Sequence, residues 1–211
     1  MWHLPRSAST SLAQQLSAQT DITNHNEIFG SWRTDVDRHE ILSQDEFIVK
    51  VNSEQYLKHK ELIDSVITSC TVVILEPRNY LDSYSSWLLP STMMKYATER
   101  NKYWNIHWGD YGGPTTPEEM KNNYDGYTVN FDDAMEEITH YSRLVDLWIE
   151  HMPMFVANGE VFKQHEVDPS FGKIWDSVAE KTNKFENPLK VIAEIDRQGA
   201  QRWAQIKEIL Q

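Results

Sequence analysis

The first twelve residues, MWHLPRSASTSL, constrain the fold of this chain more than any other stretch. A short apolar run meets a Pro5-Arg6-Ser7 turn, and small and hydroxyl residues then begin a helix. In a strand-turn-helix unit of this kind, unpaired backbone N–H groups and the positive end of the helix attract an anion to the turn. Arg6 would add a fixed charge, and Ser7, Ser9 and Thr10 would add hydroxyl donors. The stretch predicts a phosphate-binding turn, and an N-terminal tail before a serine-capped helix is the alternative interpretation.

Size and composition indicate one globular domain. A chain of 211 residues can bury a full core but is short for two domains, so we expect a single domain over 1–211. With 40% apolar and 25% charged residues, the composition excludes a disordered or collagen-like chain. The single cysteine, Cys70, excludes a disulfide framework and fits a reducing compartment. No stretch reads as a signal peptide or a membrane span, so we expect a soluble, cytoplasmic protein with no membrane partner.

The formal net charge of −12 limits the partners of the protein. Nonspecific nucleic-acid binding depends on a basic surface, so no nucleic-acid partner is expected. An anionic ligand would need a local basic pocket, and the candidate cations for it are Arg6, Lys50 and Arg78.

Hydrophobic periodicity predicts alternating helices and strands. The expected elements are a helix over 9–18, a polar loop over 21–26, a strand within 45–52, a helix over 55–67, a strand over 71–75, helices over 81–89 and 131–151, a strand near 160–164, and helices over 171–181 and 189–210. The strand at 71–75, TVVIL, has the continuous apolar character of a parallel strand that is covered on both faces. The pattern predicts an α/β fold with a mainly parallel sheet.

Residues 90–130 differ from the rest of the chain because aromatic side chains are interleaved there with glycine and proline. We interpret this segment as a lid or an acceptor-side insertion rather than a second domain. Its aromatic residues would either pack the lid and core or stack on an acceptor such as a sugar or an aromatic alcohol.

The turn at 5–10 is not a Walker loop, because the glycines and the lysine of G-x-x-x-x-G-K-[ST] are missing. In doubly wound folds the ligand lies beyond the carboxyl ends of the strands. The residues that directly follow TVVIL, Glu76 to Arg78, should therefore border the same crevice as the turn.

Two motifs resemble those of the PAPS-dependent sulfotransferase family. PRSAST resembles the 5′-phosphosulfate loop, P-[KR]-[ST]-G-[ST]-T, and Arg78-Asn79-x-x-Asp82-x-x-x-Ser86-Trp87 resembles the 3′-phosphate motif, R-[ND]-x-x-D-x-x-x-S-[YW]. The resemblance implies a three-layer α/β/α fold of the P-loop nucleotide-hydrolase type, with 3′-phosphoadenosine 5′-phosphosulfate (PAPS) as the donor, the bisphosphate PAP as the product and no metal. The implied nucleotide-binding residues are Pro5, Arg6, Ser7, Ala8, Ser9, Thr10, Arg78 and Ser86.

Weaker similarities suggest the catalytic groups. Asn26-Glu27-Ile28-Phe29 is similar to a family loop whose glutamate is proposed to take the proton of the acceptor hydroxyl. Lys50-Val51-Asn52 is similar to the Lys-x-His of cytosolic members, with asparagine in place of the histidine base. The resemblance therefore implies Glu27 as the base, with Arg6 and Lys50 stabilising charge at the bridging oxygen of the donor.

Three features depart from the family pattern. Ala8 replaces a loop glycine, and its Cβ could crowd the phosphate. Ser11 stands where cytosolic members have an adenine-stacking tryptophan. An alternative register of the second motif uses Ser83 in place of Ser86, but it loses the arginine.

The expected activity is transfer of a sulfuryl group from PAPS to a hydroxyl, or less readily an amine, of a small-molecule or carbohydrate acceptor. A sulfotransferase fold without activity and an atypical P-loop kinase are the alternatives. No metal site is expected, because the spacing of the scattered histidines does not suit metal ligands. These histidines are His25, His39, His107, His140, His151 and His165.

Overall fold

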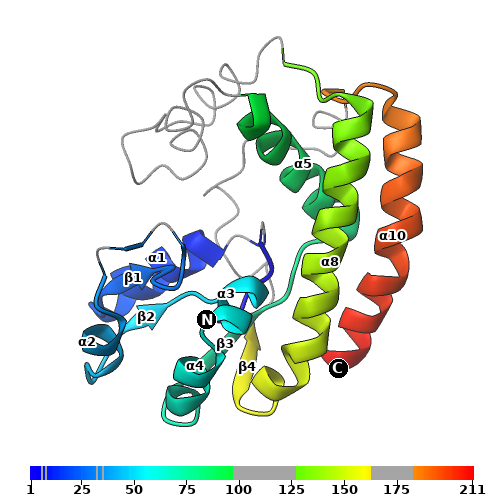
Figure 1. Ribbon diagram of the computed structural model, residues 1–211. Helices are drawn as coiled ribbons and strands as arrows, with labels where there is room; N and C mark the ends of the chain where they lie inside the picture. Colours follow the sequence, from blue (N-terminus) through cyan, green and yellow to red (C-terminus); the bar gives the residue numbers. More distant parts are fainter. Residues whose placement is uncertain (6, 8, 32, 35, 97–126, 163–182) are drawn as a thin grey trace. The chain divides into compact units, whose positions relative to one another are not determined.

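The computed structural model describes residues 1–5, 7, 9–31, 33–34, 36–96, 127–162 and 183–211, and this part of the chain has an α/β architecture (Figure 1). Its helices are α1 (Ser9–Thr20), α2 (Arg38–Leu42), α3 (Ser53–Lys58), α4 (Lys60–Ile67), α5 (Tyr80–Tyr96), α8 (Phe131–Val156) and α10 (Pro188–Ile209). Its strands are β1 (Asn24–Asn26), β2 (Ile48–Val49), β3 (Val72–Leu75) and β4 (Gly159–Phe162). No helix in these ranges is both long and apolar enough to cross a membrane.

The described residues divide into two compact units. The first contains those within Met1–Arg78, Leu144–Asp168 and Ala204–Gln211, and the second those within Asn79–Arg143 and Pro169–Trp203. The expectation of a single domain over 1–211 stays a prediction.

The first unit contains all the strands of the described residues, and its parallel pairs are joined by the first residues of the chain. β1 pairs with β2, and β3 pairs with β4, both in parallel. Trp2 forms parallel bridges to Val51 on one side and to Ile74 on the other. Its backbone N–H donates to the carbonyl of Val73 at 2.8 Å, and the N–H of His3 donates to that of Val51 at 3.2 Å. The parallel segments therefore run in the order β1, β2, residues 1–4, β3, β4, with the start of the chain in the middle.

Apolar burial explains why the central segments pair. Trp2, Ile74 and Leu75 are almost completely buried, and the indole of Trp2 stacks on Phe155 with ring centroids 4.0 Å apart. Gly159 lies opposite Val72, where an added Cβ would come within 2.6 Å of the Val72 carbonyl oxygen. Only glycine allows β4 to approach β3 this closely.

Most of the expected elements are confirmed. The strands expected within 45–52, at 71–75 and near 160–164 correspond to β2, β3 and β4, and the helix expected over 9–18 corresponds to α1. The last helix, expected over 189–210, corresponds to α10. The helix expected over 171–181 and most of the insertion at 90–130 lie outside the described residues.

Two expectations are wrong in part. The polar loop expected over 21–26 contains β1, whose Asn-His-Asn sequence pairs with β2 through the backbone. The helix expected over 55–67 is two helices, because His59 leaves the helical region at φ −126° and ψ 26°.

Two further helices are longer than expected, because α5 continues past Pro90 and α8 past Pro153. A proline inside a helix removes one backbone hydrogen bond, but packing can sustain the helix beyond it. The sequence pattern therefore placed these two helix ends too early.

The second unit is held by aromatic contacts. The Tyr84 hydroxyl and Ser142 Oγ lie 2.7 Å apart, and Tyr84 packs edge-on against Tyr141. Trp203, expected in the core, is buried beside Tyr84. The expectation that Trp148 is a core residue is also confirmed, in the first unit, whereas Trp175 lies outside the described residues.

Candidate active site

A buried polar cluster lies in the first unit where three neighbouring parallel segments end. His3 belongs to the central segment, Glu27 directly follows β1, and Lys50 directly follows β2. Their exposed fractions are 2%, 7% and 1%. Because the carboxyl ends of parallel strands meet at one edge of a sheet, residues 47 positions apart in sequence become neighbours here.

Lys50 connects the acid to the turn. Its Nζ lies 3.3 Å from Glu27 Oε1 and donates a hydrogen bond to Thr10 Oγ1 at 2.7 Å. The structure thus brings together Glu27, Lys50 and Thr10, three of the residues expected at the site. The lysine ammonium is held between a carboxylate and the first turn of α1.

The second oxygen of Glu27 is held by Gln55, which the sequence analysis missed. Gln55 Nε2 donates to Glu27 Oε2 at 2.9 Å. The orientation of the Gln55 amide is set by a capping box at the start of α3: Gln55 Oε1 accepts from the Asn52 N–H at 3.1 Å, and Asn52 Oδ1 accepts from the Gln55 N–H at 3.0 Å. Asn52, which stands where a histidine base would be expected, therefore begins a helix and indirectly positions Glu27.

These contacts keep Glu27 charged despite its burial. Burial alone would raise the pKa of Glu27, but the Lys50 ammonium, His3 and the Gln55 amide together lower it below its usual 4.5. Glu27 is therefore a carboxylate at neutral pH, and it can accept a proton.

His3 is the second residue that the sequence analysis missed. Its Nδ1 lies 3.2 Å from the Leu4 carbonyl oxygen and its Nε2 lies 3.9 Å from Glu27 Oε1. Burial is the main reason that the pKa of His3 falls from 6.5 to about 4, so its ring is neutral at neutral pH. The sequence did contain a signal for His3: it is a polar residue in the apolar run that leads directly into the turn.

The turn itself contains a buried hydroxyl without a partner. The Ser7 N–H donates to the Leu4 carbonyl at 3.2 Å, which closes the turn, and Ser9 begins α1. Ser7 is 1% exposed, and its Oγ has no hydrogen-bond partner among the residues that the structure describes. A buried, unsatisfied hydroxyl costs about 1–3 kcal/mol, and a ligand oxygen could satisfy it. Pro5 is half-buried, and Arg6 and Ala8 lie outside the described residues.

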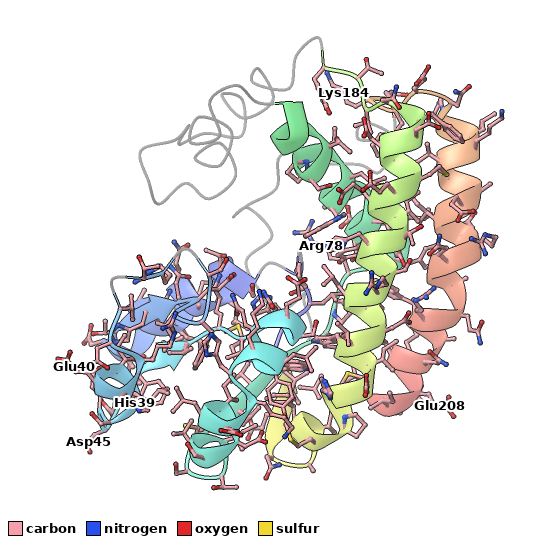
Figure 2. All side chains as sticks on the ribbon, viewed as in Figure 1. His39, Glu40, Asp45, Arg78, Lys184 and Glu208 are labelled. Atoms are coloured by element: carbon pink, nitrogen blue, oxygen red, sulfur yellow. The ribbon has the colours of Figure 1, made fainter. Side chains whose placement is uncertain are left out.

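The two residues of the expected 3′-phosphate motif belong to different units. Arg78 is half-buried and ends the first segment of the first unit, and Figure 2 labels it. Ser86 is 8% exposed on α5 of the second unit, and the alternative, Ser83, is buried on the same helix. Binding of two phosphates of one nucleotide by Arg78, Ser86 and the turn stays a prediction.

A polar groove of about 510 Å³ lies beside α2. Arg38 forms part of it, and its Nε donates to the carbonyl of Ile28, the residue after Glu27, at 2.9 Å. Figure 2 labels His39, another lining residue. The groove is lined by Thr34, Val36, Asp37, Arg38, His39, His59 and Leu62. Within the described ranges, no group of three or more histidine, cysteine and acidic side chains is placed to hold a metal ion.

Comparisons with protein-family models, curated proteins and solved structures gave no match. The function of this chain must therefore be argued from its own residues.

Proposed function

We propose that the protein is a PAPS-dependent sulfotransferase with a P-loop-type fold, which transfers a sulfuryl group to a hydroxyl, or less readily an amine, of a small-molecule or carbohydrate acceptor. One observation carries the proposal: Lys50 Nζ lies 3.3 Å from Glu27 Oε1 and 2.7 Å from Thr10 Oγ1. It joins a candidate base to the turn that would hold the donor.

The donor fits the turn for two reasons. The unpartnered Oγ of Ser7 can donate to a phosphate oxygen, which would satisfy a buried hydroxyl. The turn follows the central parallel segment and precedes α1, so its N–H groups and the helix N-terminus can bind an anion there. The motif at Arg78–Ser86 supports a nucleotide with a second, 3′-phosphate.

The cluster has the groups that sulfuryl transfer requires. Glu27 would remove the proton of the acceptor hydroxyl, whose oxygen then attacks sulfur in line with the leaving phosphate. Lys50, with Arg6, would stabilise the negative charge that develops on the bridging oxygen. Removal of the hydroxyl proton by a positioned carboxylate contributes a factor on the order of a hundred or more.

The groove beside α2 supports a polar acceptor. Its wall includes Arg38, which contacts the backbone directly after Glu27, and most of its lining side chains can form hydrogen bonds. A carbohydrate presents hydroxyl groups to such a surface.

Thermal unfolding with nucleotides tests this function. We expect PAP to raise the melting temperature, because it binds only the folded state, and ATP to leave it unchanged. The matching assay follows transfer of labelled sulfate from PAPS to a panel of sugars and alcohols. Stabilisation by ATP but not by PAP would indicate the atypical kinase, and PAP binding without transfer would indicate a non-catalytic binding module.

A further inference from the structure

The ring of His3 has one nitrogen with a partner and one without. Nδ1 lies 3.2 Å from the Leu4 carbonyl oxygen, which can only accept a hydrogen bond. Nδ1 therefore carries the hydrogen, and Nε2 of the neutral ring presents a lone pair. Nε2 is buried, 3.9 Å from Glu27 Oε1, and has no hydrogen-bond partner within the described part of the chain.

Two acceptor atoms thus lie close together inside the protein. A lone pair and a carboxylate oxygen attract each other only when a proton lies between them. An N–H···O bond spans about 2.9 Å, so a movement of about 1 Å would let Glu27 and His3 share one. The pair is therefore arranged to take up one proton.

We propose that His3 receives from Glu27 the proton that Glu27 removes from the acceptor, a role that rests on the proposed sulfuryl transfer. As the acceptor O–H bond breaks, its proton forms an O–H bond at Glu27 Oε1 and its electron pair forms the new O–S bond. The S–O bond to the nucleotide breaks, and its electron pair leaves with PAP. The proton then moves from Glu27 Oε1 to His3 Nε2, and it is lost to solvent before the next turnover.

The ion pair between Glu27 and Lys50 favours this second transfer. Protonation of Glu27 removes the negative charge that lies 3.3 Å from the buried Lys50 ammonium, which is costly. When the proton passes to His3, the Glu27 carboxylate lies between two cations. Burial disfavours the His3 imidazolium most, and Lys50 and the amino group of Met1 also disfavour it, whereas Glu27 and the Leu4 carbonyl favour it.

Burial removes most of the usual difference between the pKa of the His3 ring and that of an ordinary carboxyl group. Histidine and glutamate ordinarily differ by about two pKa units. Burial lowers the pKa of His3 to about 4, and the pKa of Glu27 lies below 4.5.

The first arm of the test does not depend on activity. Nitrogen NMR of the His3 ring should show the hydrogen on Nδ1 at neutral pH, and Glu27→Gln should lower the pKa of His3 because it removes the neighbouring negative charge. A hydrogen on Nε2, or a His3 pKa unchanged by Glu27→Gln, overturns the proposal. If wild-type protein neither binds PAP nor transfers sulfate, the proposed function fails, and so does the role that rests on it, whatever the NMR result.

The second arm uses transfer kinetics of protein that is active. His3→Asn keeps an N–H donor for the Leu4 carbonyl but cannot take up a proton. We expect kcat to fall about tenfold or more with unchanged affinity for PAP, and the acid limb of the pH profile to move to lower pH, because the pair has lost one of its two protonation sites. An unchanged kcat, or a fall in kcat without movement of the acid limb, overturns the proposal.

Discussion

Two lysine–carboxylate pairs of the first unit lie in opposite environments. Lys50 and Glu27 are buried, with side-chain exposures of 1% and 8%; Lys50 Nζ also donates to Thr10 Oγ1, and Glu27 Oε2 accepts from Gln55. Lys60 and Asp64 form a pair one turn apart on α4, with side-chain exposures of 54% and 34%. Solvent screens the exposed pair, whereas in the buried pair the Lys50 ammonium helps to keep Glu27 charged. A contact of the same chemical type is therefore a surface detail in one place and a functional candidate in the other.

Removing the buried ammonium should have the largest effect. Lys50→Met leaves the Glu27 carboxylate buried without its cation, and we expect the free energy of unfolding to fall by about 3–5 kcal/mol and sulfate transfer to be lost. Urea unfolding measures the first effect. Lys60→Met is the matched control and should change stability little. Equal losses in the two variants would mean that the buried pair has no special role in stability.

Lowering the pH should destabilise the folded protein because His3 is buried. The unfolded chain takes up a proton on His3 near pH 6.5, whereas the folded protein does so only near pH 4. Stability is therefore lost as pH falls between these values, by about 3 kcal/mol from this residue alone.

Urea unfolding at pH 7, 5.5 and 4 measures the dependence on His3. His3→Asn should make the free energy of unfolding depend less on pH. His39→Asn, at an exposed position of α2, should leave the pH dependence unchanged. A wild-type curve with the same slope as the His3→Asn curve would show that burial does not disfavour the charged ring.

Neutralising the acid should separate binding from chemistry. Glu27→Gln keeps the size of the side chain but removes the proton acceptor, so we expect transfer to fall about a hundredfold or more while PAP still raises the melting temperature. Glu40→Gln, on the exposed face of α2, is the control and should retain full activity. Full transfer by Glu27→Gln would mean that another group is the base.

The sequence correctly predicted the elements whose side chains have a clear apolar pattern. TVVIL is continuously apolar because β3 is buried, and its pattern placed the strand to within one residue. β1 was missed because Asn24-His25-Asn26 carries no such pattern: its pairing with β2 depends on backbone groups that every residue has.

The residues of the candidate site were also predicted only in part. Glu27 and Lys50 were found by resemblance, but His3 and Gln55 became visible only when parallel segments placed them beside the acid. The pattern Asn52-Ser53-Glu54-Gln55 did contain a capping-box signal, and reading it would have placed the start of α3 and fixed the amide of Gln55.

The capping box offers the smallest and most specific test. Asn52→Ala removes the cap of α3, which should cost about 1 kcal/mol of stability, and it frees the Gln55 amide that orients Glu27. We therefore expect a several-fold fall in kcat in addition to the loss of stability. Asn130→Ala removes the cap of α8, where Asn130 Oδ1 accepts from the Asp132 N–H at 2.9 Å, and it should cost similar stability without affecting kcat. If both variants keep full activity, the orientation of Glu27 does not depend on the start of α3, and the buried pair alone positions the acid.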